Sequence, residues 1–214
     1  MIKINHISKS FANGDEKRVL FEDLSFEIGK GEMVAVMGKS GSGKTTLLNI
    51  IGGLETIDKG TYFFGKKEVS KLNSKELIKF RRKHISFVFQ NFALINDYSV
   101  EENILLPLGY KFGNKTKEKK QEVDILLERL DIPYVKKRKI ENLSGGEKQR
   151  IAIARALISD TSCILADEPT GALDEQTGML IMKLFQELRE EGKTIIIVTH
   201  DADVAQMCDR TIRI

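Results

Sequence analysis

The sequence lacks the features that would place it outside a cell or within a membrane. It has only two cysteines, Cys163 and Cys208, too few for a disulfide framework, so we expect a reducing compartment. No apolar run approaches the roughly 18 residues of a membrane-spanning helix, and residues 1–11, MIKINHISKSF, lack the apolar core of a signal peptide. We therefore expect a cytoplasmic chain, which would need another chain to cross the bilayer in any membrane process.

An excess of charge of one sign is also missing. The chain has 34 Lys and Arg against 31 Asp and Glu, a net charge of +3, which is too small to indicate a nucleic-acid partner. Hydrophobic residues make up 41% and charged residues 30%, as in ordinary globular proteins. The 214 residues suffice for one sizeable domain with room for a subdomain.

Short apolar runs alternate with amphipathic helical patterns over most of the chain. Such alternation favours a mostly parallel sheet covered on both faces. Two stretches near the N-terminus alternate instead like antiparallel strands with one wet face. The expected antiparallel strands are 2–7 and 19–28, the buried strands 33–38, 85–90, 163–167 and 194–199, and the helices 44–53, 145–159 and 175–191.

The middle of the chain differs in character. Between 91 and 143 we find no clear strand pattern, only helical patterns near 100–106 and 116–130. We therefore predict a single α/β domain over 1–214. Residues 1–90 and 144–214 would form its core, with a mostly parallel sheet and an N-terminal antiparallel β subdomain. Residues 91–143 would form an inserted α-helical subdomain.

The stretch GKSGSGKT at 38–45 matches the phosphate-loop pattern G-x-x-x-x-G-K-[ST]. An apolar strand enters it and a helix leaves it, which is the context that the motif needs. Glycines let backbone N–H groups approach phosphates, and the helix start adds partial positive charge. Lys44 would reach the β- and γ-phosphates, and Thr45 would ligate Mg²⁺. The expected nucleotide-binding residues are Gly38, Lys39, Ser40, Gly41, Ser42, Gly43, Lys44, Thr45 and Thr46.

Polar residues follow three other apolar strands. Asp167 and Glu168 end CILADE, Gln90 ends ISFVFQ and His200 follows TIIIVT. The carboxyl ends of strands in an open α/β sheet face the ligand, so we expect these side chains around one phosphate. Asp167 would hold Mg²⁺, Gln90 would touch the metal or the attacking water, and His200 would contact the γ-phosphate. Glu168, pointing to the other side of the strand, would be the general base.

A second glycine-containing loop, LSGGE at 143–147, opens the helix predicted at 145–159. Ser144 and Glu147 fit a capping box, which explains these two residues without any ligand. It does not explain Gly145 and Gly146, because two glycines in a first helical turn cost up to about 1 kcal/mol each against Ala. Bare N–H groups at a helix start favour an anion. We therefore expect this loop to reach a nucleotide held by a second copy of the chain, in a two-fold dimer.

In this order, GKSGSGKT, Gln90, LSGGE, CILADE, GALD and His200 resemble the nucleotide-binding domains of ABC transporters over essentially the whole chain. The resemblance implies an ATPase that uses ATP and Mg²⁺ and forms an ATP-sandwiched homodimer. It also implies an integral-membrane permease subunit as partner, reached by the loop after Gln90. In trans, Ser144, Gly145, Gly146 and Glu147 would close on the γ-phosphate. Asp174 of GALD would lie at the dimer seam. Phe11 would stack on adenine, where Tyr is more usual.

Longer stretches, including SGSGKTTLLNIIGGL and DEPTGALD, are similar to the macrolide-exporter, lipoprotein-releasing and bacteriocin-export group. This implies export or extracytoplasmic handling of a peptide, antibiotic or lipoprotein, with a periplasmic or extracellular adaptor as a further partner. The chain would then be peripheral on the inner face of the cell membrane. Three alternatives stay open: a metabolic P-loop kinase, a non-transport ABC ATPase of DNA repair or the ribosome, and an ABC ATPase that regulates cell-wall enzymes.

Overall fold

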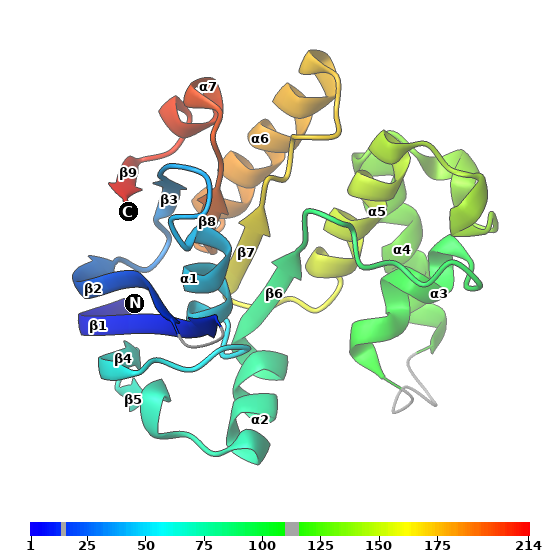
Figure 1. Ribbon diagram of the computed structural model, residues 1–214. Helices are drawn as coiled ribbons and strands as arrows, with labels where there is room; N and C mark the ends of the chain where they lie inside the picture. Colours follow the sequence, from blue (N-terminus) through cyan, green and yellow to red (C-terminus); the bar gives the residue numbers. More distant parts are fainter. Residues whose placement is uncertain (14–15, 110–115) are drawn as a thin grey trace.

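The computed structural model describes residues 1–13, 16–109 and 116–214. Two sheets organise it (Figure 1). The first is antiparallel, in the order β2-β1-β4-β5, with the strands β1 Ile2–Asn13, β2 Glu16–Ile28, β4 Lys59–Phe64 and β5 Lys67–Glu68. The second is parallel, in the order β6-β7-β8-β3-β9, with β3 Met33–Met37, β6 Ile85–Val88, β7 Cys163–Asp167, β8 Thr194–Val198 and β9 Arg210–Arg213.

Helices cover both faces of the parallel sheet. Figure 1 shows α3, α4 and α5 on one side of it and the antiparallel sheet on the other. The α-helices are α1 Lys44–Ile51, α2 Ser74–His84, α3 Val100–Leu105, α4 Thr116–Arg129, α5 Gly145–Leu157, α6 Glu175–Glu190 and α7 Ala202–Gln206. Short 3₁₀ helices occur at Val69–Lys71, Leu106–Leu108, Pro133–Val135 and Ile140–Asn142.

The apolar side chains form two clusters, one on each face of the parallel sheet. Successive side chains of a strand point to opposite faces, so β8 contributes Ile195 and Ile197 to one cluster, and Ile196 and Val198 to the other. The first cluster continues into α3, α4, α5 and α6, and the second into α1 and the antiparallel sheet. All five residues of β7 and of β8 are buried, which explains why these strands are continuous apolar runs.

The predicted fold class is confirmed: an α/β core with a parallel sheet, an antiparallel N-terminal part and a helical part. No strand occurs in the described part of 91–143, but residues 110–115 of that segment lie outside the described residues. Helix α5, which follows that segment, packs against α3 and α4. The boundaries at 90 and 144 remain predictions. We did not expect α2, α7, β4, β5 and β9.

Candidate functional site

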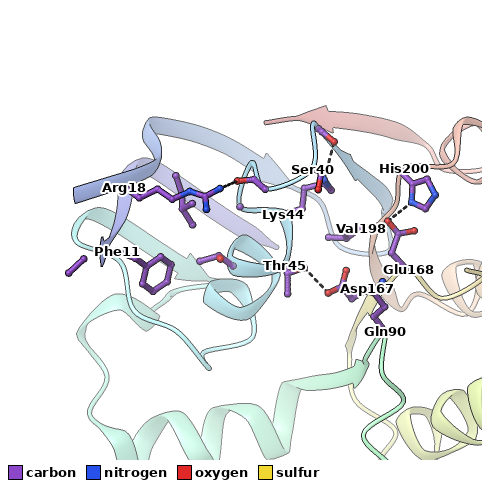
Figure 2. A pocket seen from close by; sticks show the side chains of 16 residues that line it. Phe11, Arg18, Ser40, Lys44, Thr45, Gln90, Asp167, Glu168, Val198 and His200 are labelled. Carbon is purple, nitrogen blue, oxygen red and sulfur yellow. Dashed lines mark hydrogen bonds and ion pairs between the residues drawn. The ribbon is translucent and has the colours of Figure 1, made fainter. Parts of the chain in front are cut away.

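A cleft of about 720 Å³ lies at the carboxyl edge of the parallel sheet (Figure 2). It brings together side chains that follow β3, β6, β7 and β8, as the sequence predicted. Twelve of the expected residues line it: Phe11, Gly38, Ser40, Gly41, Gly43, Lys44, Thr45, Thr46, Gln90, Asp167, Glu168 and His200. Four further residues line it that we did not expect: Ala12, Arg18, Leu20 and Val198.

The phosphate loop joins β3 to α1 and needs its glycines for packing as well as for backbone conformation. Gly41 and Gly43 have φ values of +75° and +95°, which glycine adopts without strain. A Cβ on Gly38 would lie 2.2 Å from the carbonyl oxygen of Ile214, at the end of the strand next to β3. The cap of α1, Gly43, makes no side-chain capping bond, which leaves the helix start available to an anion.

Lys44, the first residue of α1, reaches back across this loop. Its Nζ donates hydrogen bonds of 2.9 Å to the carbonyl oxygens of Gly38 and Lys39. The ammonium is thereby held at the wall of the cleft, within the curve of the loop. Lys39 and Ser42 belong to the loop but do not line the cleft.

Thr45 and Asp167 make direct contact although they are 122 residues apart. The Thr45 hydroxyl donates a 2.9 Å hydrogen bond to Oδ2 of Asp167, the last residue of β7. Burial raises the pKa of Asp167, the neighbouring Glu168 raises it further, and the Thr45 bond and Lys44 act in the opposite direction. A divalent cation would favour the ionised carboxylate here. The hydroxyl and carboxylate oxygens, with the Gln90 amide in the same cleft, fit the oxygen ligands of Mg²⁺.

Glu168 and His200 form a second pair at the same edge of the sheet. Nδ1 of His200 lies 2.8 Å from Oε1 of Glu168, and the Thr199 hydroxyl donates a 3.3 Å bond to Oε2. Glu168 has a φ of +48°, a left-handed conformation that costs a non-glycine residue free energy and is often found at functional sites. The hydrogen bond and the charge of Glu168 raise the pKa of His200.

Phe11 lies at the other end of the cleft, where its side chain is partly exposed. Nζ of Lys9 lies 4.9 Å from the centroid of its ring. Lys9 is buried and its ammonium lies 2.8 Å from Glu55 and 3.7 Å from Asp58. The cation–π interaction with Lys9 holds the Phe11 ring in position, as is needed for a ring on which a planar base stacks.

The second loop does not line the cleft. Ser144 caps α5: its backbone N–H donates a 2.8 Å bond to Glu147 Oε2 and its hydroxyl oxygen accepts a 3.2 Å bond from the Glu147 N–H, which together form the expected capping box. A Cβ on Gly145 would meet no atom within 4 Å in the described part of the chain. One on Gly146 would lie 3.6 Å from Leu173, an ordinary contact. Nothing in the described fold therefore requires these two glycines.

Asp174 follows Leu173 and caps α6. Its carboxylate accepts bonds of 2.9 Å from the Thr177 N–H and 2.7 Å from the Thr177 hydroxyl. These bonds lower the pKa of Asp174. Because a Cβ on Gly146 would lie only 3.6 Å from Leu173, Asp174 and the second loop belong to neighbouring parts of the surface, outside the cleft.

Sequence reasoning missed Arg155, which ties α5 to the loop after Gln90. Its buried guanidinium donates to the carbonyl oxygens of Ala93 and of Phe92, the latter at 2.6 Å. Both acceptors have positive φ, +48° and +61°. Burial lowers the pKa of Arg155. The helix that opens with Gly145 is thus hydrogen-bonded to the segment that follows a cleft residue.

Comparisons with known proteins identify a family and several relatives of this chain. The family model described as ABC transporter matches residues 21–171. The chain is 43% identical over its whole length to the macrolide export ATP-binding/permease protein MacB of Shewanella sp. (strain ANA-3) and 44% identical to MacB of Campylobacter jejuni (strain ATCC 700819 / NCTC 11168). It spans only about a third of those relatives, 32% and 33%.

A relative of similar length is the uncharacterized ABC transporter ATP-binding protein YvrO of Bacillus subtilis (strain 168). It is 44% identical over 212 residues, which cover 99% of this chain and 92% of YvrO. Among solved structures, the ATP-binding cassette MJ0796, a dimer in a post-hydrolysis state bound to ADP and Pi, superposes with a TM-score of 0.95. The two chains are 39% identical, over 100% of this chain and 94% of that one.

These similarities exclude a metabolic P-loop kinase, because they extend through both glycine loops and the helical part. No helix in the described part of the chain is both long and apolar enough to cross a membrane. The chain belongs to the ABC transporter family and is one of its ATP-binding ATPase cassettes.

Proposed function

We propose that this chain binds MgATP in the cleft and hydrolyses it as a two-fold homodimer, in which each ATP is enclosed by the second loop of the other copy. The difference between the two loops carries the proposal. The first loop has a cleft in front of it, whereas the second has glycines without a role in the described fold. A partner's phosphate would occupy the open space at Gly145 and accept bonds from the helix start. The dimeric state of MJ0796 supports this arrangement.

In this proposal the expected residues keep their roles. Phe11 stacks on adenine, and the loop from Gly38 to Thr46, with Lys39 and Ser42 acting through their backbone, holds the phosphates. Thr45, Asp167 and Gln90 would hold Mg²⁺, which would supply positive charge to offset the negative charge that develops on the phosphates.

Two groups at the sheet edge handle the water and the γ-phosphate. Glu168 accepts the proton of the attacking water as general base. Lys44 and His200 donate hydrogen bonds to the phosphoryl oxygens as negative charge develops on them. The His200–Glu168 bond of 2.8 Å holds the two side chains close together before ATP arrives.

The partner copy completes the site. Its Ser144, Gly145, Gly146 and Glu147 face the γ-phosphate, and Asp174 lies at the seam between the two chains. Hydrolysis removes the bridging phosphate, so the dimer opens. The change between closed and open dimers would transmit the free energy of ATP binding and hydrolysis to a partner protein.

We further propose that the partner is an integral-membrane permease and that the cassette works peripherally at the inner face of the cell membrane. The assembly would carry out export or extracytoplasmic handling of a peptide, antibiotic or lipoprotein. The names of the MacB relatives, which combine macrolide export, ATP binding and a permease, support the export of an antibiotic. YvrO, of which this chain covers 92%, supports a permease on a separate chain. A periplasmic or extracellular adaptor would complete such an assembly.

The catalytic part is tested with Glu168→Gln. We expect ATP binding to persist and turnover to fall by at least about 10²-fold, as expected for loss of a general base. The variant should accumulate as a dimer with ATP and Mg²⁺ in analytical ultracentrifugation. Glu190→Gln, an exposed change on α6 outside the cleft, is the matched control. Near-normal turnover of Glu168→Gln would contradict its assignment.

The transport part is tested by purifying tagged Glu168→Gln from the membranes of its native host with MgATP. Recovery of a permease with a large extracytoplasmic domain supports export. Recovery of a membrane protein that acts on cell-wall enzymes would instead support the regulatory alternative. If no membrane protein is recovered, the transport proposal fails while the catalytic proposal stands on its own experiment.

A further inference from the structure

The cleft contains a cation that neither the motifs nor the proposed mechanism uses. Arg18 lies on β2, outside the phosphate loop, and its side chain lines the cleft. Its Nη2 donates a 3.2 Å hydrogen bond to the carbonyl oxygen of Gly41. Figure 2 shows Arg18 reaching from β2 to the loop on the side of the cleft where Phe11 lies. The antiparallel sheet thus adds a positive charge beside the phosphate loop.

We propose that Arg18 is a nucleotide-binding residue that contacts the phosphates nearer the nucleoside. This inference rests on the nucleotide site proposed above. A nucleotide with its base on Phe11 and its last phosphate beside Glu168 and His200 must run along the loop past Gly41. Arg18 is hydrogen-bonded to that part of the loop, so it meets the phosphates closest to the sugar.

The present bond of Arg18 leaves room for a better acceptor. A backbone carbonyl is a neutral acceptor, and 3.2 Å is at the long end of the usual range. A phosphate oxygen is anionic and matches the guanidinium fork, so its hydrogen bonds are shorter and stronger. The guanidinium has five N–H donors, so it can bind phosphate and keep its bond to the loop.

Gly41 is what allows the guanidinium to come this close. A Cβ at position 41 would lie 2.9 Å from Nη2 of Arg18, and the φ of +75° already disfavours any other residue there. Glycine therefore leaves the space that the guanidinium occupies at the rim of the loop.

The charges along the cleft also favour this position. Lys44 and Arg18 both donate to carbonyl oxygens of the loop, whereas Asp167 and Glu168 lie at the far end, beyond Thr45 (Figure 2). A phosphate chain laid on the loop would meet the cations first and the carboxylates, with their metal, last. Arg18 would thus add affinity for ATP and ADP alike.

The test compares binding by calorimetry in wild type, Arg18→Gln and Arg82→Gln. Arg82 is an exposed residue of α2 outside the cleft, so its change matches the lost charge without the contact. We expect Arg18→Gln to weaken ADP binding about five- to tenfold, as for loss of a charge-assisted hydrogen bond, and adenosine binding to stay unchanged. ATP, measured in the Glu168→Gln background, should lose the same factor, and Arg82→Gln should match wild type.

Further results decide the assignment of Arg18. ADP affinity of Arg18→Gln within twofold of wild type would overturn the inference, and a loss confined to ATP would overturn the position given to the contact. A direct contact also makes ADP binding by wild type more salt-sensitive than binding by Arg18→Gln. If the nucleotide-free variant had a lower melting temperature and the salt sensitivity of its ADP binding were unchanged, Arg18 would stabilise the loop without contacting the nucleotide. If wild type binds no ADP, the proposed nucleotide site fails instead.

Discussion

A side chain at Gly38 would place its Cβ 2.2 Å from the Ile214 carbonyl oxygen, whereas a side chain at Gly145 would enter open space among the described residues. Gly41 and Gly43 of the first loop also need positive φ, whereas Gly145 and Gly146 are ordinary residues of α5. Contacts and backbone conformation within a single chain explain the glycines of the first loop, but they do not explain those of the second. Glycines without a role in the monomer indicate that their role lies in an assembly.

The largest effect that would sharpen this comparison is expected from Gly145→Ala. Alanine favours helices, so the free chain should keep its stability or gain up to about 1 kcal/mol. ATP hydrolysis should fall about 10²-fold, because the new methyl group would displace a partner's phosphate from the N–H donors at the helix start. Urea denaturation and steady-state ATPase assays measure the two effects. Wild-type turnover in a normally folded variant would remove the basis for an in-trans role.

Mixing two inactive variants tests the same point without relying on one substitution. A heterodimer of Lys44→Ala and Gly145→Ala combines both defects in one site and leaves the other site intact. If the sites are shared between chains, mixing should restore activity, up to about a quarter of wild type for random two-fold pairing. Sites contained in one chain would give no recovery at any ratio.

The opposite pattern is expected from Gly38→Ala. Its methyl group would clash with backbone at the end of β9, which cannot move as a flexible side chain can. Overpacking of this kind costs about 2 kcal/mol, so the nucleotide-free chain should lose stability in urea denaturation. Gly145→Ala is the matched control, with the same change in the other loop. If the two variants were equally stable, the contrast between the loops would be wrong.

A smaller effect is expected where α5, the helix that begins at the second loop, is hydrogen-bonded to the segment after Gln90. Arg155→Lys should destabilise the chain by about 1 to 2 kcal/mol, because one ammonium cannot replace the buried guanidinium at two carbonyl oxygens. It should also lower ATPase activity, since α5 and the segment after Gln90 lose their link.

Arg150→Lys is the control for Arg155→Lys on the same helix. Arg150 also donates to two backbone carbonyl oxygens, those of Leu130 and Asp131, but these lie outside the loop after Gln90. We expect Arg150→Lys to lower the stability of the chain. Its ATPase activity should change little when both variants are assayed under conditions in which they are fully folded. Equal losses of activity would show that any weakening of α5 has the same effect.

The sequence predicted which residues come together at the cleft, because they follow strands that can be recognised from short segments of sequence. Each of β3, β6, β7 and β8 is a short apolar run, and parallel strands bring their carboxyl ends to one edge. Gln90, Asp167 and His200 therefore had to meet, although they are far apart in the chain. The residue spacing of the phosphate loop also indicated the class of ligand, a nucleotide, and the end of the cleft at which its phosphates would lie.

The residues that were missed depend on contacts that no local pattern specifies. Arg18 meets Gly41 across 23 residues and Arg155 meets Ala93 across 62, in neither case within a motif. Strand β9, RTIR, has one buried residue among four and exists because it pairs with β3. Helix α2 did carry a signal, since Asn73 and Glu76 form a capping box, but it buries only Phe80 and so lacks an apolar stripe.

The smallest predicted effect lies on the first-loop side of the site and concerns His200. Its hydrogen bond to Glu168 and that group's charge raise its pKa above the ordinary 6.5. The stabilisation of the folded chain by the interaction of protonated His200 with Glu168 is thus fully present below the ordinary pKa, and it is lost as the pH rises through the raised pKa. NMR titration should show the raised pKa in dilute, monomeric chain, because both residues belong to one copy. In Glu168→Gln it should return toward 6.5, while His84, whose pKa burial lowers, stays unchanged. A raised pKa that appeared only in the dimer would mean that the partner completes this half of the site as well.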